Sequence, residues 1–207
     1  EQKEKEIDRY RVYVVAFQKN GGTLVKAVRA SSSDAVNFSA DLEQSGLFDI
    51  YVVANTSYDL AMEIAGLPSS SKAEDLFALK ATQTPGTPLT GNISDLNWIS
   101  STDGYFLMVG KNENAKQGPA GGDSGGTDIG AITLTRASVR IDVDATGSDI
   151  TLSSLKLNKR YESTILVRTD ETDMTGLDAP TTDYTISASG ETATAALYTY
   201  EYTGNDT

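Results

Sequence analysis

The chain has 207 residues with neither cysteine nor histidine, and its 17 basic and 29 acidic side chains give a net charge of −12. The two absences exclude disulfides, thiolate zinc sites, cysteine nucleophiles and imidazole general bases. The negative charge argues against nucleic acid or an anionic membrane surface as a partner, since both would repel the chain. Residues 1–7 are too charged for a signal peptide, so we expect any export signal to have been removed.

The first half of the chain predicts a series of short strands. Alternating side chains over 8–17 (DRYRVYVVAF) predict a strand with a dry face. Asn20-Gly21-Gly22 supplies turn chemistry, and 24–29 follows as the hairpin partner. Further strands are predicted at 35–40, 48–54 and 105–109.

Two short helices are predicted between these strands, at 58–65 and 72–82. Ser71 and Glu74 match the Ser-x-x-Glu capping box, which places the start of the second helix just after Ser71. The proline-containing stretch 84–101 that follows is predicted to be a loop.

The second half of the chain predicts strands alone. The stretch 117–128 (QGPAGGDSGGTD) is rich in glycine and without periodicity, which is typical of a connecting loop. Strands are then predicted at 131–145, 150–157, 163–168, 183–188 and 192–202. We therefore predict a mainly β protein with two β-sandwich domains, residues 1–128 and 129–207.

One string in the glycine-rich loop resembles an enzyme motif. Residues 122–126 (GDSGG) match the surroundings of the nucleophile in trypsin-like serine proteases. A serine hydroxyl needs a general base, and the chain has no histidine to take its proton. Carboxylate pairs could hydrolyse glycosides, but none can be placed at catalytic spacing. The sequence therefore predicts no enzyme and no cofactor.

Residues 142–149 (DVDATGSD) resemble the first half of a calcium loop. The twelfth position is Ser153, where such a loop needs a bidentate glutamate. Because Asp142 and Asp144 alternate along a predicted strand, we interpret them as its polar face and predict no metal site, with weak calcium binding as the alternative. A second acidic group is interpreted as a solvated loop: Asp170, Glu171 and Asp173.

Surface features leave a second kind of function open. Sequons for N-glycosylation, which have meaning only in a cell with that machinery, begin at Asn37, Asn55, Asn92 and Asn205. Aromatic side chains suit the apolar faces of sugars. A sugar-stacking platform could be formed by Trp98, Tyr105, Tyr184, Tyr198, Tyr200 and Tyr202. The alternation of the last three favours one face of a strand instead.

Four segments, in this order, resemble the fimbrillin family of Bacteroidales. They are 11–17 with the Asn-Gly-Gly turn, 48–55 (FDIYVVAN), 132–143 (ITLTRASVRIDV) and 197–202 (LYTYEY). The resemblance implies two transthyretin-like β-sandwich domains, the first with two short helices and the second incomplete. It also implies a lipoprotein precursor anchored in the outer membrane, removal of an N-terminal strand by a protease, and polymerisation with other fimbrial subunits at the cell surface.

A sandwich that lacks one strand exposes an apolar groove with unpaired backbone groups, which the strand of another subunit can fill. We expect such an empty groove here, with its pockets lined by Val12, Val14, Ala16, Ile50, Val52 and Ala54. The function expected is that of a structural fimbrial subunit that supports adhesion. The alternative is a carbohydrate-binding module at a cell surface, and a tip adhesin would combine the two.

Overall fold

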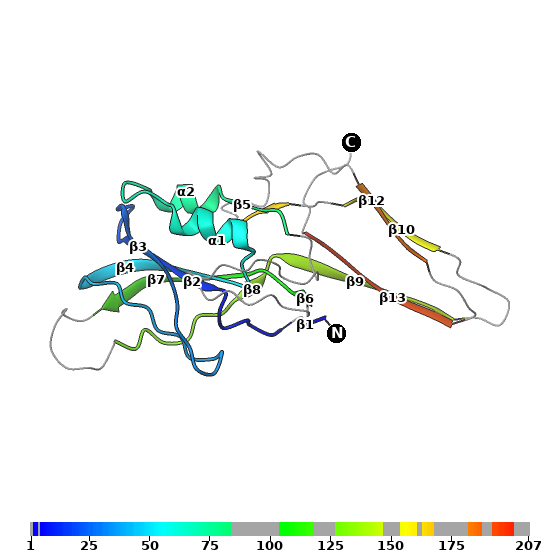
Figure 1. Cartoon of the computed structure of the whole chain (residues 1–207), viewed down its shortest axis with the longest axis horizontal. Helices are drawn as coiled ribbons and strands as arrows, with labels where there is room; N and C mark the ends of the chain where they lie inside the picture. The colour runs from blue at the N-terminus through cyan, green and yellow to red at the C-terminus, as the bar shows by residue number, and fades with distance from the viewer. Residues whose placement is uncertain are drawn as a thin grey trace.

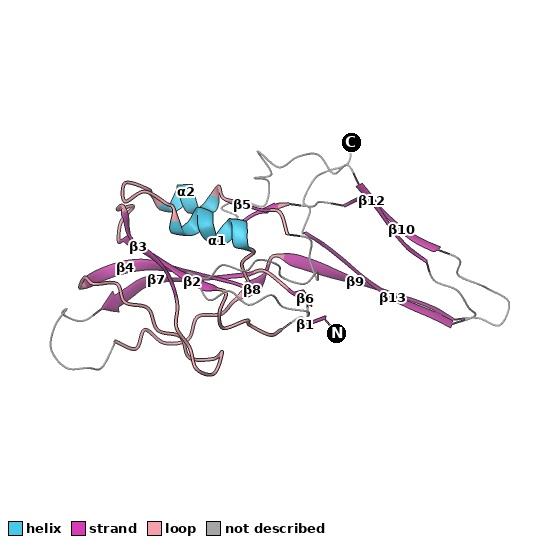
Figure 2. Cartoon of the chain, viewed as in Figure 1, coloured by secondary structure: helices cyan, strands magenta, loops and turns pink. Residues whose placement is uncertain are grey.

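The computed structural model describes residues 2–3, 5–83, 104–117, 127–146, 154–160, 163–167, 182–187 and 192–200. The fold is mainly β with two short helices, as the sequence predicts (Figure 2). The helices are α1 (Tyr58–Ala65) and α2 (Ala73–Phe77). The strands are β1 (Gln2–Lys3), β2 (Val12–Gln18), β3 (Leu24–Arg29), β4 (Gly46–Ala54), β5 (Lys80–Ala81), β6 (Gly104–Tyr105), β7 (Met108–Gln117), β8 (Thr135–Arg136), β9 (Ser138–Thr146), β10 (Ser154–Arg160), β11 (Thr164–Ile165), β12 (Thr182–Ser187) and β13 (Thr192–Tyr200).

The central element is an antiparallel five-stranded sheet in the order β3-β2-β4-β7-β8. The helices lie over one face of this sheet (Figure 1). The other described strands form pairs: β9 with β13, β10 with β12 and β5 with β11 are antiparallel, and β1 with β6 is parallel. Figure 1 shows the β9–β13 and β10–β12 ladders extending beyond one end of the sheet.

β2 is buried on both faces, where the sequence predicts one dry face. All residues from Val12 to Phe17 are buried, because the alternating side chains enter two different apolar clusters. Tyr13, Val15 and Phe17 face the helices. A strand read in isolation shows alternation but does not reveal that its second face is also covered.

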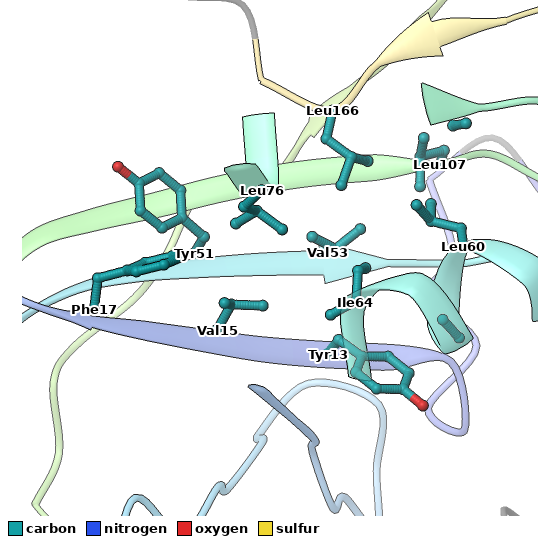
Figure 3. Close-up of a cluster of buried hydrophobic side chains, with 12 residues drawn as sticks. Tyr13, Val15, Phe17, Tyr51, Val53, Leu60, Ile64, Leu76, Leu107 and Leu166 are labelled. Atoms are coloured by element: carbon teal, nitrogen blue, oxygen red, sulfur yellow. The ribbon is translucent and has the colours of Figure 1, made fainter. Parts of the chain in front are cut away.

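The helix-side cluster fills the space between the sheet, the two helices α1 and α2, and Leu166, which follows β11 (Figure 3). The ring centroids of Phe17 and Tyr51 lie 6.0 Å apart at 77°, the edge-to-face arrangement that aromatic pairs favour. Leu60, Ala61 and Ile64 supply the buried stripe of α1 at helical spacing. This layer makes the helix face of the sheet the interior of the protein.

Both predicted helices form, but the second is shorter and starts differently. α1 has the predicted bounds, and the Ser57 hydroxyl accepts a hydrogen bond from the Leu60 amide at 3.3 Å. The capping box predicted for Ser71 and Glu74 is wrong by one residue, because the Asp75 carboxylate accepts from the Lys72 amide at 2.8 Å. The Ser71 carbonyl instead accepts from the Leu24 amide at 2.7 Å, which fixes Ser71 in the loop beside β3.

The strand predicted at 35–40 is a loop with a single bridge between Ser31 and Ser39. The Asp34 carboxylate accepts from the amides of Val36 and Asn37 at 2.9 and 2.8 Å, which turns the backbone and leaves Ala35 at a φ of 61°. These hydrogen bonds, with those of Asn37 first, hold the pKa of the Asp34 carboxyl well below its ordinary value. Local side-chain hydrogen bonds therefore replace the predicted strand.

The strand predicted at 131–145 is interrupted. Residues 127–134 form no strand, β8 has two residues, and the continuous strand begins at Ser138. The predicted loop at 84–101 lies outside the described residues. Of the loop predicted at 117–128, Gln117 ends β7 instead, residues 127–128 form no strand, and residues 118–126 lie outside the described residues.

Described segments beyond residue 128 pack against the first half of the chain. β8 joins the central sheet, β11 pairs with β5, and Leu166 lies in the helix-side cluster. The ring of Tyr198 lies 4.7 Å from that of Phe106, centroid to centroid. The division into domains 1–128 and 129–207 stays a prediction.

Candidate functional site

The six residues predicted to line a groove lie together on one face of β2 and β4, opposite the helices. In the antiparallel register Val12 is opposite Ala54, Val14 is opposite Val52, and Ala16 is opposite Ile50. We call these six residues the β2–β4 face. β7 adds a third residue beside each of these pairs, since Met108, Gly110 and Asn112 pair with Ala54, Val52 and Ile50 of β4 in that order. Period-two alternation in the two strands is enough to bring them together.

This face is not empty as expected, because the chain itself covers it. Five of the six residues are buried, with relative exposures of 0% to 9%, and Val52 is half-buried. The cover comes from the loop before β4 and from residues 129–134, which we call the covering segment. Ile129, Ile132 and Leu134 of that segment pack against the cluster. Use of the six residues as polymerisation pockets stays a prediction.

Gly110 allows the covering segment to approach the sheet closely. A β-carbon at this position would lie 2.4 Å from the carbonyl oxygen of Thr133 and 2.9 Å from Cγ2 of Ile132. The neighbouring Asn112 donates its Nδ2–H to the Ile129 carbonyl at 3.0 Å. The segment is therefore seated by one missing side chain and one amide hydrogen bond.

The outer edge of β7 lies beside this face. β8 pairs with only Met108 and Val109, and no other strand in the described part of the chain pairs with that edge over residues 110–117. A cavity of about 510 Å³ adjoins the edge. It is lined by Tyr51, Val109, Lys111, Thr133, Arg136 and Leu166, among others. Its mixed lining and the neighbouring backbone edge suit an extended peptide better than a compact polar metabolite.

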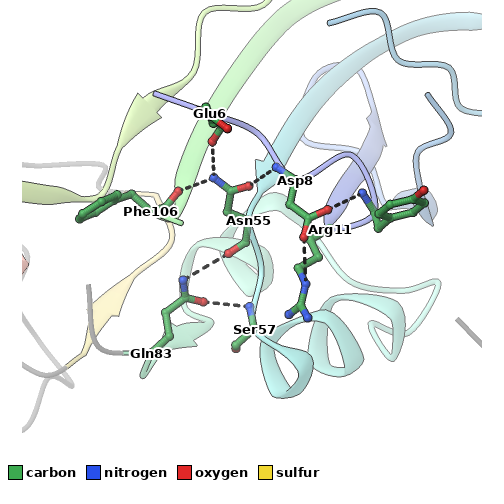
Figure 4. A network of polar contacts seen from close by, with 8 residues as sticks. Glu6, Asp8, Arg11, Asn55, Ser57, Gln83 and Phe106 are labelled. Carbon is green, nitrogen blue, oxygen red and sulfur yellow. Dashed lines mark hydrogen bonds and ion pairs between the residues drawn. The ribbon is translucent and has the colours of Figure 1, made fainter. Parts of the chain in front are cut away.

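At the end of β4, Asn55 binds three different segments together (Figure 4). Its Nδ2 donates to the carbonyls of Glu6 and Phe106 at 3.0 and 2.7 Å, and its Oδ1 accepts from the Asp8 amide at 2.8 Å. Its own carbonyl accepts from Gln83 Nε2 at 3.2 Å. Asn55 adopts a φ of 61°, which asparagine tolerates better than most residues. The network fixes residues 6–8 against the β2–β4 face.

Arg11 lies next to this network with a fully buried side chain. Its Nε lies 3.3 Å from an Asp8 carboxylate oxygen. Burial lowers the pKa of the guanidinium, and the attraction of Asp8 and then of Tyr105 opposes that shift. Because an arginine stays protonated even so, the ion pair keeps a buried positive charge compensated.

Comparison with known proteins gives a match among solved structures. No protein-family model and no curated protein matches the chain. Among solved structures, it is similar to "The tip fimbrial protein Mfa3 from Porphyromonas gingivalis with C-terminal truncation", with a TM-score of 0.59 and 14% identity. The likeness is one of fold. The match covers 94% of this chain and 63% of the other, so the chain spans less than two thirds of that protein's length.

The other motifs of the sequence have different outcomes. Asp142 lies in β9 and accepts from Arg140 Nε at 2.6 Å, as expected for the polar face of a strand. In the parts of the chain that the structure describes, no group of three acidic, histidine or cysteine side chains could hold a metal ion. Residues 122–126, the acidic loop at 170–173 and Trp98 lie outside those parts. No helix among the described residues is long and apolar enough to span a membrane.

Two of the tyrosines offered as an alternative sugar-stacking platform are buried, and the side chain of Tyr184 in β12 is not among those described. Tyr198 and Tyr200 are 7% and 1% exposed, and the Tyr200 hydroxyl donates to the Gln83 carbonyl. Tyr105 is half-buried, and Tyr202 lies outside the described residues. Tyr198 and Tyr200 therefore lie on one face of β13, as the sequence favours, and that face is buried.

Sequence reasoning missed the structural roles of Gly110, Asn55 and the covering segment. A glycine inside an apolar strand does signal close approach of another backbone, so Gly110 could have been noticed. Asn55 had a weaker signal, because an asparagine after a strand is common in turns. The covering segment had none, since its apolar alternation is that of an ordinary strand.

Proposed function

We propose that this chain is a structural subunit of a cell-surface fimbrium, joined to its neighbours by an extended strand that binds at the β2–β4 face. The observation that carries the proposal is local: an apolar sheet face covered by a non-strand segment lies beside a β7 edge with no strand partner among the described residues. The fold of a tip fimbrial protein supports the same function.

Strand addition suits this site physically. An incoming extended segment would satisfy the backbone groups along residues 110–117 of β7, which is the source of affinity in strand addition. Its alternate side chains would enter the apolar cluster that Ile132 and Leu134 occupy. The many hydrogen bonds formed together make such a joint long-lived. The partners are other subunits of the same filament, after export of a lipid-anchored precursor to the outer membrane.

A position at the filament tip is the second candidate. The matched structure is described as a tip fimbrial protein, and a tip subunit needs an acceptor or donor strand at one end only. Adhesion to a host or bacterial surface ligand would then be added to the structural role. Glycan binding that is lost on replacing Trp98 or Tyr105 would favour this candidate.

The test measures entry of the chain into filaments sheared from cells that make it. Val52→Asp places a carboxylate in a half-buried apolar contact, at a cost of about 1–3 kcal/mol. We expect this variant to fall at least roughly ten-fold in the filament fraction. Val36→Asp is the matched control, because Val36 is 77% exposed in a loop. Equal incorporation of wild type and Val52→Asp would contradict the proposal.

A further inference from the structure

The covering segment fills the space that an incoming strand would need. Ile132, Thr133 and Leu134 all approach the position of a β-carbon on Gly110 within 3 Å. Gly110 pairs with Val52, which is in the centre of the β2–β4 face. Since packed interiors hold no space for two occupants, the segment and a donor strand exclude each other.

The segment is also held in a way that allows it to leave. Its described residues make no strand pairing, and the Asn112 amide provides one side-chain hydrogen bond to it. The remaining attachment is apolar contact from three half-buried side chains, Ile129, Ile132 and Leu134. Ala131 and Thr133 between them are exposed. Elements with few backbone hydrogen bonds open locally without unfolding of the whole protein.

A donor strand would gain what the segment lacks. Residues 110–117 of β7 offer a backbone edge along which a strand can pair, whereas the covering segment crosses Gly110 and the chain joins that edge only after the segment, at β8. The incoming strand can therefore make a row of backbone hydrogen bonds while it replaces the same apolar contacts.

We infer that residues 129–134 are a built-in occupant of the β2–β4 face, and that they leave it when an extended strand from a second subunit binds. The inference rests on the proposed function and adds its regulation: the face is protected from non-specific association until a donor arrives. The more weakly the segment is attached, the faster subunits should assemble.

The first experiment tests local uncovering on the monomer, and the absence of cysteine from the chain makes introduced thiols unique. Val52→Cys reports on the β2–β4 face, and Val53→Cys, which is 0% exposed, reports on the helix face of the same strand. Each is combined with Ile132→Asp, which weakens the covering segment, or with Thr133→Asp, whose side chain is exposed. The rate of modification by a thiol reagent is measured.

We expect Ile132→Asp to raise the reactivity of the Val52→Cys thiol at least roughly ten-fold, with the Val53→Cys thiol unchanged. Thr133→Asp should change neither. Equal acceleration of both thiols would show that the segment is part of one cooperative core and would overturn the inference. If Ile132→Asp accelerates modification at neither position, the inference is overturned too.

The second experiment follows assembly in cells. If the segment competes with the donor, Ile132→Asp enters the sheared filament fraction faster than wild type, and Thr133→Asp enters at the wild-type rate. Entry of Ile132→Asp at the wild-type rate or more slowly would overturn the inference and leave the proposed function intact. If the wild-type protein is absent from the filament fraction, the proposed function is overturned. Displacement of the covering segment by a donor strand is then overturned with it, whatever the thiol rates show.

Discussion

Replacing Asn55 by alanine removes three hydrogen bonds at one buried position. The lost partners are the carbonyls of Glu6 and Phe106 and the amide of Asp8. At about 1 kcal/mol net for each bond, these losses cost about 3 kcal/mol of unfolding free energy. The φ of 61° adds about 1 kcal/mol, because a β-carbon without a local hydrogen bond is disfavoured there. We therefore expect a destabilisation of about 3–4 kcal/mol.

The assay is chemical unfolding followed by circular dichroism, with two companion variants. Asn55→Gly loses the same bonds but relieves the backbone, so it should be about 1 kcal/mol more stable than Asn55→Ala. Asn20→Ala is the matched control, because Asn20 has a φ of 68° and an exposed side chain. If Asn55→Ala cost no more than Asn20→Ala, the network in Figure 4 would have no role in stability and the reasoning would be refuted.

Three further outcomes follow from the same contacts. Leu166→Ala should cost about 2–5 kcal/mol of unfolding free energy, since Leu166 is 5% exposed in the helix-side cluster, whereas Leu47→Ala, at a position 51% exposed, should be near neutral. Equal unfolding midpoints of the two variants in urea would refute the packing of Leu166 against the first half of the chain. Burial raises the pKa of the Tyr13 hydroxyl above 10.0, so the stabilising contribution of this group is present below that pH and is lost as the pH rises through the folded pKa. The Tyr13→Phe variant should therefore lose less unfolding free energy in alkali than wild type. An identical decline of the two proteins would argue against burial of this hydroxyl. In an NMR titration the Asp34 carboxyl should titrate below 3.8, and a value at or above it would show that the turn is absent in solution.

Local signals in the sequence were sufficient for some elements. The bounds of α1 follow from Ser57 as cap, the apolar spacing of Leu60, Ala61 and Ile64, and the stop at Gly66. β3 also has its predicted bounds, because the Asn-Gly-Gly turn fixes its start. These elements are determined by contacts within a few residues, which a sequence displays directly.

Other elements depend on partners that are distant in the chain. The alternation Ile132-Thr133-Leu134 predicts a strand, but these side chains pack on a sheet face rather than along an edge. The same holds for Ser71, whose role as a cap is taken by Lys72 and Asp75 once its carbonyl binds the Leu24 amide. Periodicity indicates which side chains are buried, and tertiary contacts decide what buries them.

The candidate site shows the same division. Alternation alone predicts that the six residues of the β2–β4 face lie together, and the register of β2 and β4 confirms it. That the loop before β4 and residues 129–134 would cover the face could not be read from the sequence, because the cover depends on tertiary contacts such as the close approach at Gly110. The covered face makes displacement, rather than filling of an empty groove, the step that assembly requires.

Immunogold electron microscopy of cells that make the protein, with antibody raised against this chain, tests its role as a filament subunit most directly. We predict label on surface filaments, either along the shafts or at the tips. Label on the cell envelope with no filaments would contradict that role and favour a carbohydrate-binding module instead.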